Sequence, residues 1–275
     1  MIIKRINTLA YICAITAFTS LPVASEDEVF VASIDNNNIT SVNNISNRVG
    51  YDNQPHFSED GQSLLFTSMF AKESVNAPQS QQTDSLRYNL ASQTLENLTN
   101  SNASEYSPTI TPDGKHFSVI RVADDGKQVL WQYPYKSTSS AKELKGVGLA
   151  NSIFDVGYHV WLNNNELLIF LLGETMTLQR LQLDKQKISL VDTDIGRTLR
   201  KHPNKDLFSY TKETIDKRWQ LKLYNPETKK IISDVTLPND NMYYAWHIDG
   251  RLLSADKAVI MQSNALTDSS QWQPL

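Results

Sequence analysis

The chain has very little cysteine: Cys13 is its only one among 275 residues. A chain with one cysteine cannot form an internal disulfide, so a packed core must supply the stability. Positive charge is not in excess either, because the formal net charge is −4 and the pI is about 5.7. This balance excludes a globally basic nucleic-acid binder. A mean hydropathy of −0.39 also excludes a protein with many membrane spans.

Familiar catalytic motifs are missing as well. The sequence contains no Gly-x-Ser-x-Gly elbow, no His-Glu-x-x-His zinc motif, no Walker phosphate loop and no dinucleotide-binding glycine fingerprint. No stretch after residue 25 keeps a 3.6-residue apolar period for three turns, which argues against long amphipathic helices. We therefore expect no cofactor, and we favour a protein that is not an enzyme.

Long apolar runs are confined to the N-terminus. Lys4 and Arg5 precede an apolar stretch from Leu9 to Val23, and small residues follow up to Ser25. This order is typical of a secretory signal peptide. The run is also too short and too interrupted for a membrane span. We expect cleavage after Ser25, a signal peptide over residues 1–25, one domain over 26–275 without an integral span, and a periplasmic or secreted protein.

The remaining chain repeats itself. The segment Tyr51–Thr67 and the segment Ser104–Ile120 are 53 positions apart, and both contain a short strand, an Asp-Gly turn and a second strand. In such a turn the Asp side chain bonds the backbone and the Gly accepts a positive φ. Weaker copies begin near Val156, Leu199 and Tyr244.

A second kind of hairpin lies between these copies. Its strands alternate apolar and polar residues at period two, as in Ser85–Leu98, Leu178–Val191 and Trp219–Ile232. An inner and an outer hairpin therefore alternate about every 40–53 residues, which predicts one four-stranded blade of a β-propeller per repeat.

The segments Phe57-Ser-Glu-Asp-Gly61 and Ile110-Thr-Pro-Asp-Gly-Lys115 resemble the Ser-Pro-Asp-Gly-Lys signature of WD-repeat-like propellers of the bacterial TolB type. The likeness is strongest from Tyr51 to about Arg121. It implies a six-bladed ring in an exported bacterial protein, whereas periodicity alone allows five or six blades. It implies no particular activity, since propellers support many functions.

Counting the hairpins gives six outer elements but five inner ones. We expect a six-bladed layout with an incomplete last blade, and the alternative is a five-bladed propeller. A missing inner hairpin would leave an open strand edge, through which copies of the chain could associate.

The first strand of each propeller blade lines the channel, and the residues at its start line one mouth. These positions form the candidate ligand-binding set, which contains Asp52, Asn53, Gln54, Glu105, Tyr106, Tyr158, His159, Arg197 and Tyr244. Such a mixture of amides, charges and tyrosines suits a polar ligand or peptide. In the alternative interpretation Asp52 and Glu105 cap turns, the tyrosines pack between blades, and Arg197 neutralises a carboxylate.

The five histidines all fall in inner hairpins, which raises the question of a metal site. Strand alternation leaves only His159 and His202 as candidate neighbours of the channel, so no metal site is predicted. The leading hypothesis is a non-catalytic protein that binds a protein or peptide of the cell envelope at its channel mouth, with no role for nucleic acid. The alternative is a metal-assisted lyase or hydrolase that acts on a polysaccharide or small ester.

Overall fold

The computed structural model describes residues 8–13, 27–48, 50–71, 81–135, 146–150, 152–238, 241–264 and 271–275. These residues form strands and turns and no helix, which confirms the all-β prediction. Across the described ranges there is accordingly no helix with the length and apolarity to cross a bilayer.

The first two blades follow the two strongest sequence repeats. Blade 1 consists of β4 (Asp52–Phe57), β5 (Ser63–Ala71), β6 (Gln81–Asn89) and β7 (Thr94–Asn97). Blade 2 consists of β8 (Glu105–Ile110), β9 (His116–Val122), β10 (Gln128–Pro134) and β11 (Val147–Gly148). In each blade every strand pairs antiparallel with the next strand of the chain, so the sheet is a simple meander.

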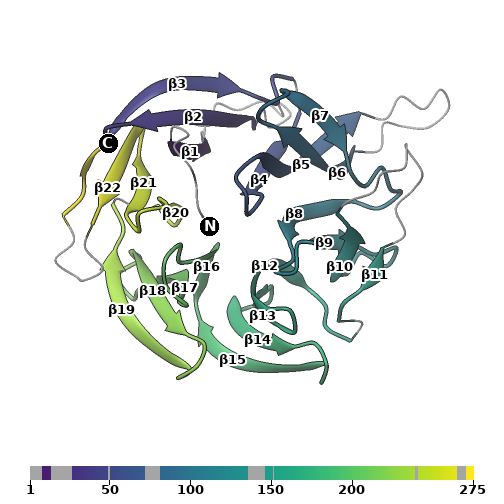
Figure 1. Cartoon of the computed structure of the whole chain (residues 1–275). Coiled ribbons are helices and arrows are strands. Elements are labelled where there is room, and N and C mark those ends of the chain that lie inside the picture. Colours follow the sequence, from purple (N-terminus) through teal and green to yellow (C-terminus); the bar gives the residue numbers. More distant parts are fainter. Residues whose placement is uncertain are drawn as a thin grey trace, which may run out of the picture. The chain divides into compact units, whose positions relative to one another are not determined.

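Three further blades repeat this topology (Figure 1). Blade 3 contains β12 (Val156–Asn163), β13 (Glu166–Leu171), β14 (Thr177–Gln182) and β15 (Lys187–Thr193). Blade 4 contains β16 (Ile195–Lys201), β17 (Phe208–Glu213), β18 (Trp219–Asn225) and β19 (Lys230–Thr236). Blade 5 contains β20 (Tyr244–Trp246), β21 (Leu252–Asp256), β22 (Val259–Ser263) and β23 (Gln273–Pro274).

The remaining sheet is three-stranded, in the order β1 (Thr8–Cys13), β2 (Val29–Asp35) and β3 (Asn38–Asn44). The described strands therefore contain the six outer hairpins and five inner hairpins that the sequence predicts. Five of the sheets are complete four-stranded blades, as in the five-bladed alternative. The sixth outer hairpin, β2–β3, is paired with β1 instead of with an inner hairpin.

In each blade, a side chain at the start of the turn between the first and second strands forms hydrogen bonds within that turn. Ser58 Oγ accepts the amide of Ser63 and donates to Asp60, while Gly61 takes a φ of +67°. The same position accepts a turn amide in blades 1 to 4, and its occupants are Ser58, Thr111, Asn163 and His202. In blade 5 the occupant is His247, whose Nδ1 lies 2.7 Å from Asp249 Oδ1 of the turn. A hydroxyl, an amide oxygen and an imidazole nitrogen thus perform one structural task.

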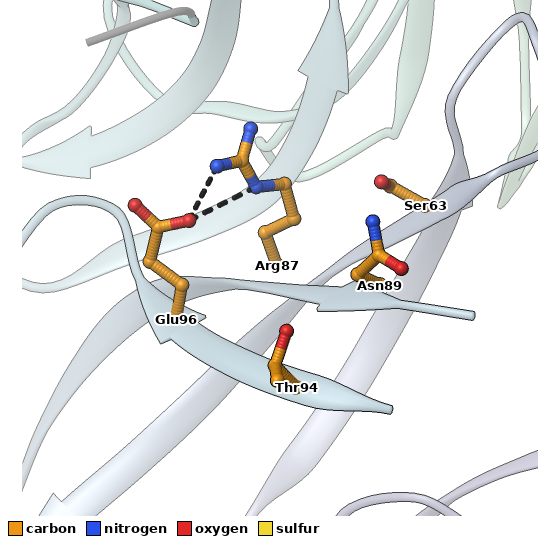
Figure 2. Close-up of a pocket in the computed structure, with 5 residues that line it drawn as sticks. All are labelled: Ser63, Arg87, Asn89, Thr94 and Glu96. Carbon is orange, nitrogen blue, oxygen red and sulfur yellow. Dashed lines mark hydrogen bonds and ion pairs between the residues drawn. The ribbon is translucent and has the colours of Figure 1, made fainter. Parts of the chain in front are cut away.

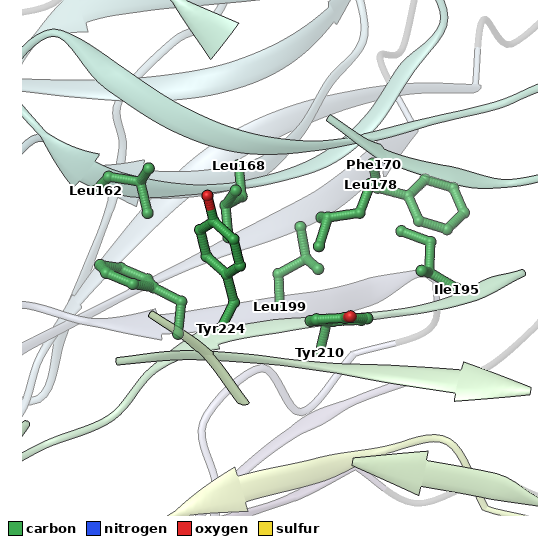
Figure 3. Close-up of a cluster of buried hydrophobic side chains, with 9 residues drawn as sticks. Leu162, Leu168, Phe170, Leu178, Ile195, Leu199, Tyr210 and Tyr224 are labelled. Atoms are coloured by element: carbon green, nitrogen blue, oxygen red, sulfur yellow. The ribbon is translucent and has the colours of Figure 1, made fainter. Parts of the chain in front are cut away.

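Apolar clusters join consecutive blades. Figure 3 shows Leu168, Phe170 and Leu178 of blade 3 facing Leu199 and Tyr210 of blade 4. All five side chains are at most 3% exposed. Because burial of one such side chain contributes roughly 1.5–3 kcal/mol, this cluster is a major source of stability for both blades.

The chain divides into two compact units. The first comprises residues 1–6, 13–31 and 42–154, and it contains blades 1 and 2. The second comprises residues 7–12, 32–41 and 155–275, and it contains blades 3 to 5. The N-terminal sheet contributes residues to both units.

Candidate functional site

Each blade has two ends that differ in their connections. The first strand begins at one end, and the connection from the second to the third strand lies at that same end because the strands alternate in direction. We call this end the start rim of the blade and the opposite end the turn rim. All nine predicted ligand-binding residues belong to the start rims or to the strands that begin there.

In blade 1, Asp52 is buried rather than displayed to solvent, with an exposed fraction of 1%. Its Oδ1 lies 2.6 Å from Arg48 Nη2 and accepts a hydrogen bond from Ser68 Oγ. Burial raises the pKa of Asp52, although the hydrogen bond from Ser68 and the charge of Arg48 act in the opposite direction. The neighbouring Asn53 is half-buried and accepts the amide of Gln54 at 2.6 Å.

Gln54 connects the two blades of the first unit. It has a φ of +57° and lies at an irregularity in the β4–β5 pairing. Its Oε1 accepts hydrogen bonds from Thr67 Oγ1 at 2.8 Å and from the amide of Ser107 at 2.9 Å. Ser107 is the equivalent residue 53 positions on, and it too has a positive φ, +54°. The repeat therefore conserves a bulge at the beginning of the first strand.

Glu105 is the equivalent of Asp52 in blade 2 and is fully buried. Its Oε1 accepts hydrogen bonds from Tyr133 Oη at 2.9 Å and from Ser101 Oγ, and it lies 3.3 Å from Arg121 Nη1. Burial raises the pKa of Glu105, against the effect of these hydrogen bonds. Among the described residues its second oxygen, Oε2, has no hydrogen-bond partner. The adjacent Tyr106 is half-buried.

The second unit contains the other four predicted residues. Tyr158 is half-buried, and its ring packs edge-on against Phe170 with 5.6 Å between centroids. His159 is buried, and Tyr244 is buried and donates to Ser209 Oγ of the preceding blade at 2.7 Å. Arg197 is exposed and forms no ion pair with any residue that the structure describes.

The structure thus separates the predicted set by accessibility. Asp52, Glu105, His159 and Tyr244 are internal, whereas Arg197 reaches solvent and the others are half-buried. Tyr244 packs against the preceding blade, as the alternative interpretation expects of the tyrosines. A ligand-binding role for the set remains a prediction.

Sequence reasoning missed a cleft at the start rim of blade 4. It encloses about 580 Å³, and its lining residues are Asp194, Lys212, Glu213, Thr214, Ile215, Lys217, Gln220 and Lys222. Lys212 pairs with Asp192 and donates to the carbonyl of Thr193, and Lys217 Nζ lies 3.1 Å from Glu213. Three lysines therefore stand beside two carboxylates in the lining.

Ile215 at the edge of this cleft is fully exposed. It lies in a tight turn in which Thr214 Oγ1 donates to Asp216 and accepts the amide of Arg218, and the amide of Lys217 donates to the carbonyl of Thr214. The turn thus holds an apolar side chain in water at a defined position. The only signal in the sequence is one isoleucine within a polar turn.

A smaller depression of about 230 Å³ lies toward the turn rim of blade 1 (Figure 2). Its lining residues are all polar: Ser63, Arg87, Asn89, Thr94 and Glu96. Arg87 is already paired with Glu96, and its guanidinium also lies 5.4 Å from the ring of Tyr135. The local cation is therefore compensated.

The histidines do not form a metal centre in the described part of the chain, where no three His, Cys, Asp or Glu side chains gather. His202 Nδ1 accepts the amide of Asn204 at 3.1 Å, and its ring lies 4.5 Å from that of Trp246. His247 Nδ1 lies 2.7 Å from Asp249. Both imidazoles thus serve the turns of their blades.

No protein-family model and no curated protein matches the sequence. Solved structures do match the fold. TolB from Acinetobacter baumannii is 11% identical with a TM-score of 0.64 over 94% of this chain, and this chain spans 60% of that protein's length. The putative TolB from Agrobacterium tumefaciens is 12% identical with a TM-score of 0.60, over 85% of this chain and 83% of that one.

A puromycin-hydrolyzing peptidase from Mycobacterium tuberculosis also matches, at 11% identity and a TM-score of 0.54, over 96% of this chain and 44% of its own. At such identities the likeness concerns the fold and not the activity. The meander blades, the Asp-Gly turns and these structural matches agree: the chain has the β-propeller fold of the TolB type.

Proposed function

We propose that this protein is exported and binds a protein or peptide of the cell envelope at the start rim of blades 3 to 5, without catalysing a reaction. The proposed export rests on the signal-like order of residues 1–25, with cleavage after Ser25. The proposed binding rests on the distribution of exposed apolar side chains in the second unit.

Three large apolar side chains of this unit are exposed in connections, and all three belong to the start rim. Leu172 follows β13, Ile215 lies between β17 and β18, and Tyr243 precedes β20, with exposed fractions of 37%, 103% and 44%. The described connections at the turn rim of these blades expose no large apolar side chain. The outer strands of these blades also expose apolar side chains, Leu190 and Ile232 among them, so the restriction to one rim holds for the connections between strands. Exposed apolar groups gathered at one rim are typical of interaction surfaces.

Ile215 is the observation that carries the proposal. Because its turn is already ordered by Thr214, little conformational entropy would be lost when a partner covers the side chain. Burial of an isoleucine would contribute roughly 1.5–3 kcal/mol. Arg197, which is exposed and forms no ion pair with any described residue, would supply a positive charge for a carboxylate of the partner.

The test is capture of envelope proteins by the exported protein after chemical crosslinking in cells. We expect Ile215→Asp combined with Arg197→Ala to reduce the recovered partner at least tenfold. The matched control is Ile232→Asp, which changes a 52% exposed isoleucine on β19 of the same blade. Equal capture by the double variant and the parent would refute the proposal, and so would an equal loss in the control.

A further inference from the structure

The N-terminal sheet places β2 between two neighbours, β1 on one side and β3 on the other. β1 spans Thr8–Cys13, which lies within the predicted signal peptide. Cleavage after Ser25 would therefore remove one neighbour of β2 and leave the other. The mature chain would begin with a strand whose second edge is vacant.

β2 has the character of an interior strand. Val29 and Val31 point to one face and Ala32 and Ile34 to the other, and all four are at most 6% exposed. The side chains of β3, in contrast, are exposed along nearly the whole strand. β3 therefore resembles the outer edge strand of a blade, whereas β2 resembles a strand that requires pairing on both sides.

The hydrogen-bond direction of each β2 residue identifies the vacant edge. The carbonyl of Val29 accepts the amide of Ile45, and the carbonyl of Ser33 accepts Thr40 Oγ1, so the odd-numbered residues face β3. Because backbone groups alternate along a strand, Phe30, Ala32 and Ile34 face β1. These residues would lose their partners on cleavage.

Most of β2 lacks the features that protect an exposed edge. Proteins usually guard such edges with charged residues, proline or a bulge, but residues 29–34 contain no charge and no proline, and the one charged residue of the strand, Asp35, lies at its C-terminal end. Each buried backbone group without a hydrogen bond is costly, so a vacant edge of this kind favours the addition of a strand.

We propose that the mature protein accepts an extended, uncharged segment of a partner protein, about six residues long, as a new strand on the edge of β2 that β1 occupies in the full chain. The inference rests on the proposed partner binding and on cleavage after Ser25. The occupying sequence Thr-Leu-Ala-Tyr-Ile-Cys shows the chemistry that fits: six residues without charge. Burial on both faces of β2 favours an extended segment over a second folded copy.

The test uses the exported, processed protein and a synthetic peptide with the sequence of Thr8–Cys13, carrying Cys13→Ser and terminal lysines for solubility. Amide hydrogen exchange is measured residue by residue. Without peptide, we expect Phe30, Ala32 and Ile34 to exchange at least tenfold faster than Val31 and Ser33, the internal controls. The peptide should protect the three fast amides at least tenfold.

Two controls make the result specific. A peptide with Ala10→Pro and Ile12→Pro should not protect, because proline lacks the donor that a sheet requires. The protein variant Ala32→Pro removes an amide on the β1 side only, and it should weaken binding of the Thr8–Cys13 peptide at least tenfold. If this variant does not fold, the comparison of the two peptides still tests the inference.

Equal exchange of all five β2 amides in the processed protein would overturn the inference, as would equal protection by both peptides. An exported protein that still begins at Met1 would overturn it too. None of these results depends on Ile215 or Arg197, so the start-rim proposal is tested separately.

Discussion

In blades 1 and 2, a residue at the beginning of the first strand is both acidic and buried. Asp52 and Glu105 occupy equivalent positions in blades 1 and 2, and each is paired with an arginine and at least one hydroxyl. The arginine is Arg48, before the first strand, for Asp52, and Arg121, in the second strand, for Glu105. Blades 1 and 2 thus share the buried acid and differ in its counter-charge.

This arrangement gives Glu105 a defined pH dependence. Because burial raises the pKa of Glu105, the folded protein binds this proton more readily than the unfolded chain. The stabilisation from protonated Glu105 is complete below the pKa of this group in the unfolded chain, about 4.3, and is lost as pH rises through its pKa in the folded protein. Relative to Glu105→Gln, the parent should therefore become more stable from pH 7 to pH 4.5, as measured by urea unfolding. A difference that stays constant with pH would contradict this.

His202 should behave in the opposite sense. Burial and the charge of Lys205 lower the pKa of His202, so the unfolded chain takes up the proton first as pH falls. The stabilisation is complete above about pH 6.5 and decreases through the folded pKa. Relative to His202→Asn, which keeps an acceptor for Asn204, the parent should lose stability between pH 7 and pH 5.5 in the same unfolding assay. Parallel curves for the two proteins would be inconsistent with this role.

At the scale of an element, the first strand of blade 4, β16, packs closely against the other strands of its own sheet. A Cβ on Gly196 would lie 2.2 Å from Thr211 Oγ1 and 2.9 Å from the ring of Trp219. Both neighbours belong to the same sheet as Gly196, in β17 and β18. Any side chain at this position would therefore require Thr211 and Trp219 to move.

We expect Gly196→Ala to destabilise the protein by about 1–3 kcal/mol, because the added methyl group overpacks a closed space. Gly173→Ala is the matched control, since its Cβ would meet only the carbonyl of Thr175 at 3.5 Å. Thermal unfolding of both variants compares the two sites. Similar midpoints would show that β16 can shift away from Thr211.

At the scale of the whole molecule, stability arises between repeats as much as within them. The cluster around Phe170 and Tyr210 belongs to blades 3 and 4 together, and that around Leu221 and Tyr244 belongs to blades 4 and 5. Blade 4 therefore has an apolar face toward each neighbour. In such an array the stability of one blade depends on the next.

Phe170→Ala should accordingly destabilise both blade 3 and blade 4. Removal of a buried phenylalanine costs about 3–5 kcal/mol. We expect faster amide exchange in β16–β18 of blade 4 as well as in blade 3, by mass spectrometry of peptic fragments. Ile232→Ala, at an exposed site of blade 4, should leave exchange unchanged. A change limited to blade 3 would mean that the blades unfold independently.

The sequence predicted those features that depend on neighbours along the chain. The turns at Gly61 and Gly114 follow from an Asp-Gly pair between alternating strands, and both have the expected φ of +67°. The burial of Glu105 could not be predicted in this way, because Tyr133 and Arg121 approach it from other strands. The exposure of Ile215 could not be predicted either, since an apolar residue in a strand-rich chain is usually part of a core.

The bulge at Ser107 has a consequence for how these repeats can be exchanged. Its amide donates to Gln54 and Thr67, which lie in the preceding blade. A recombination point in the loop between β7 and β8 would cut no strand, yet it would separate this donor from both acceptors. For shuffling or circular permutation, the transferable module therefore begins inside the first strand, beyond the bulge, and not at the loop where the blade visibly starts.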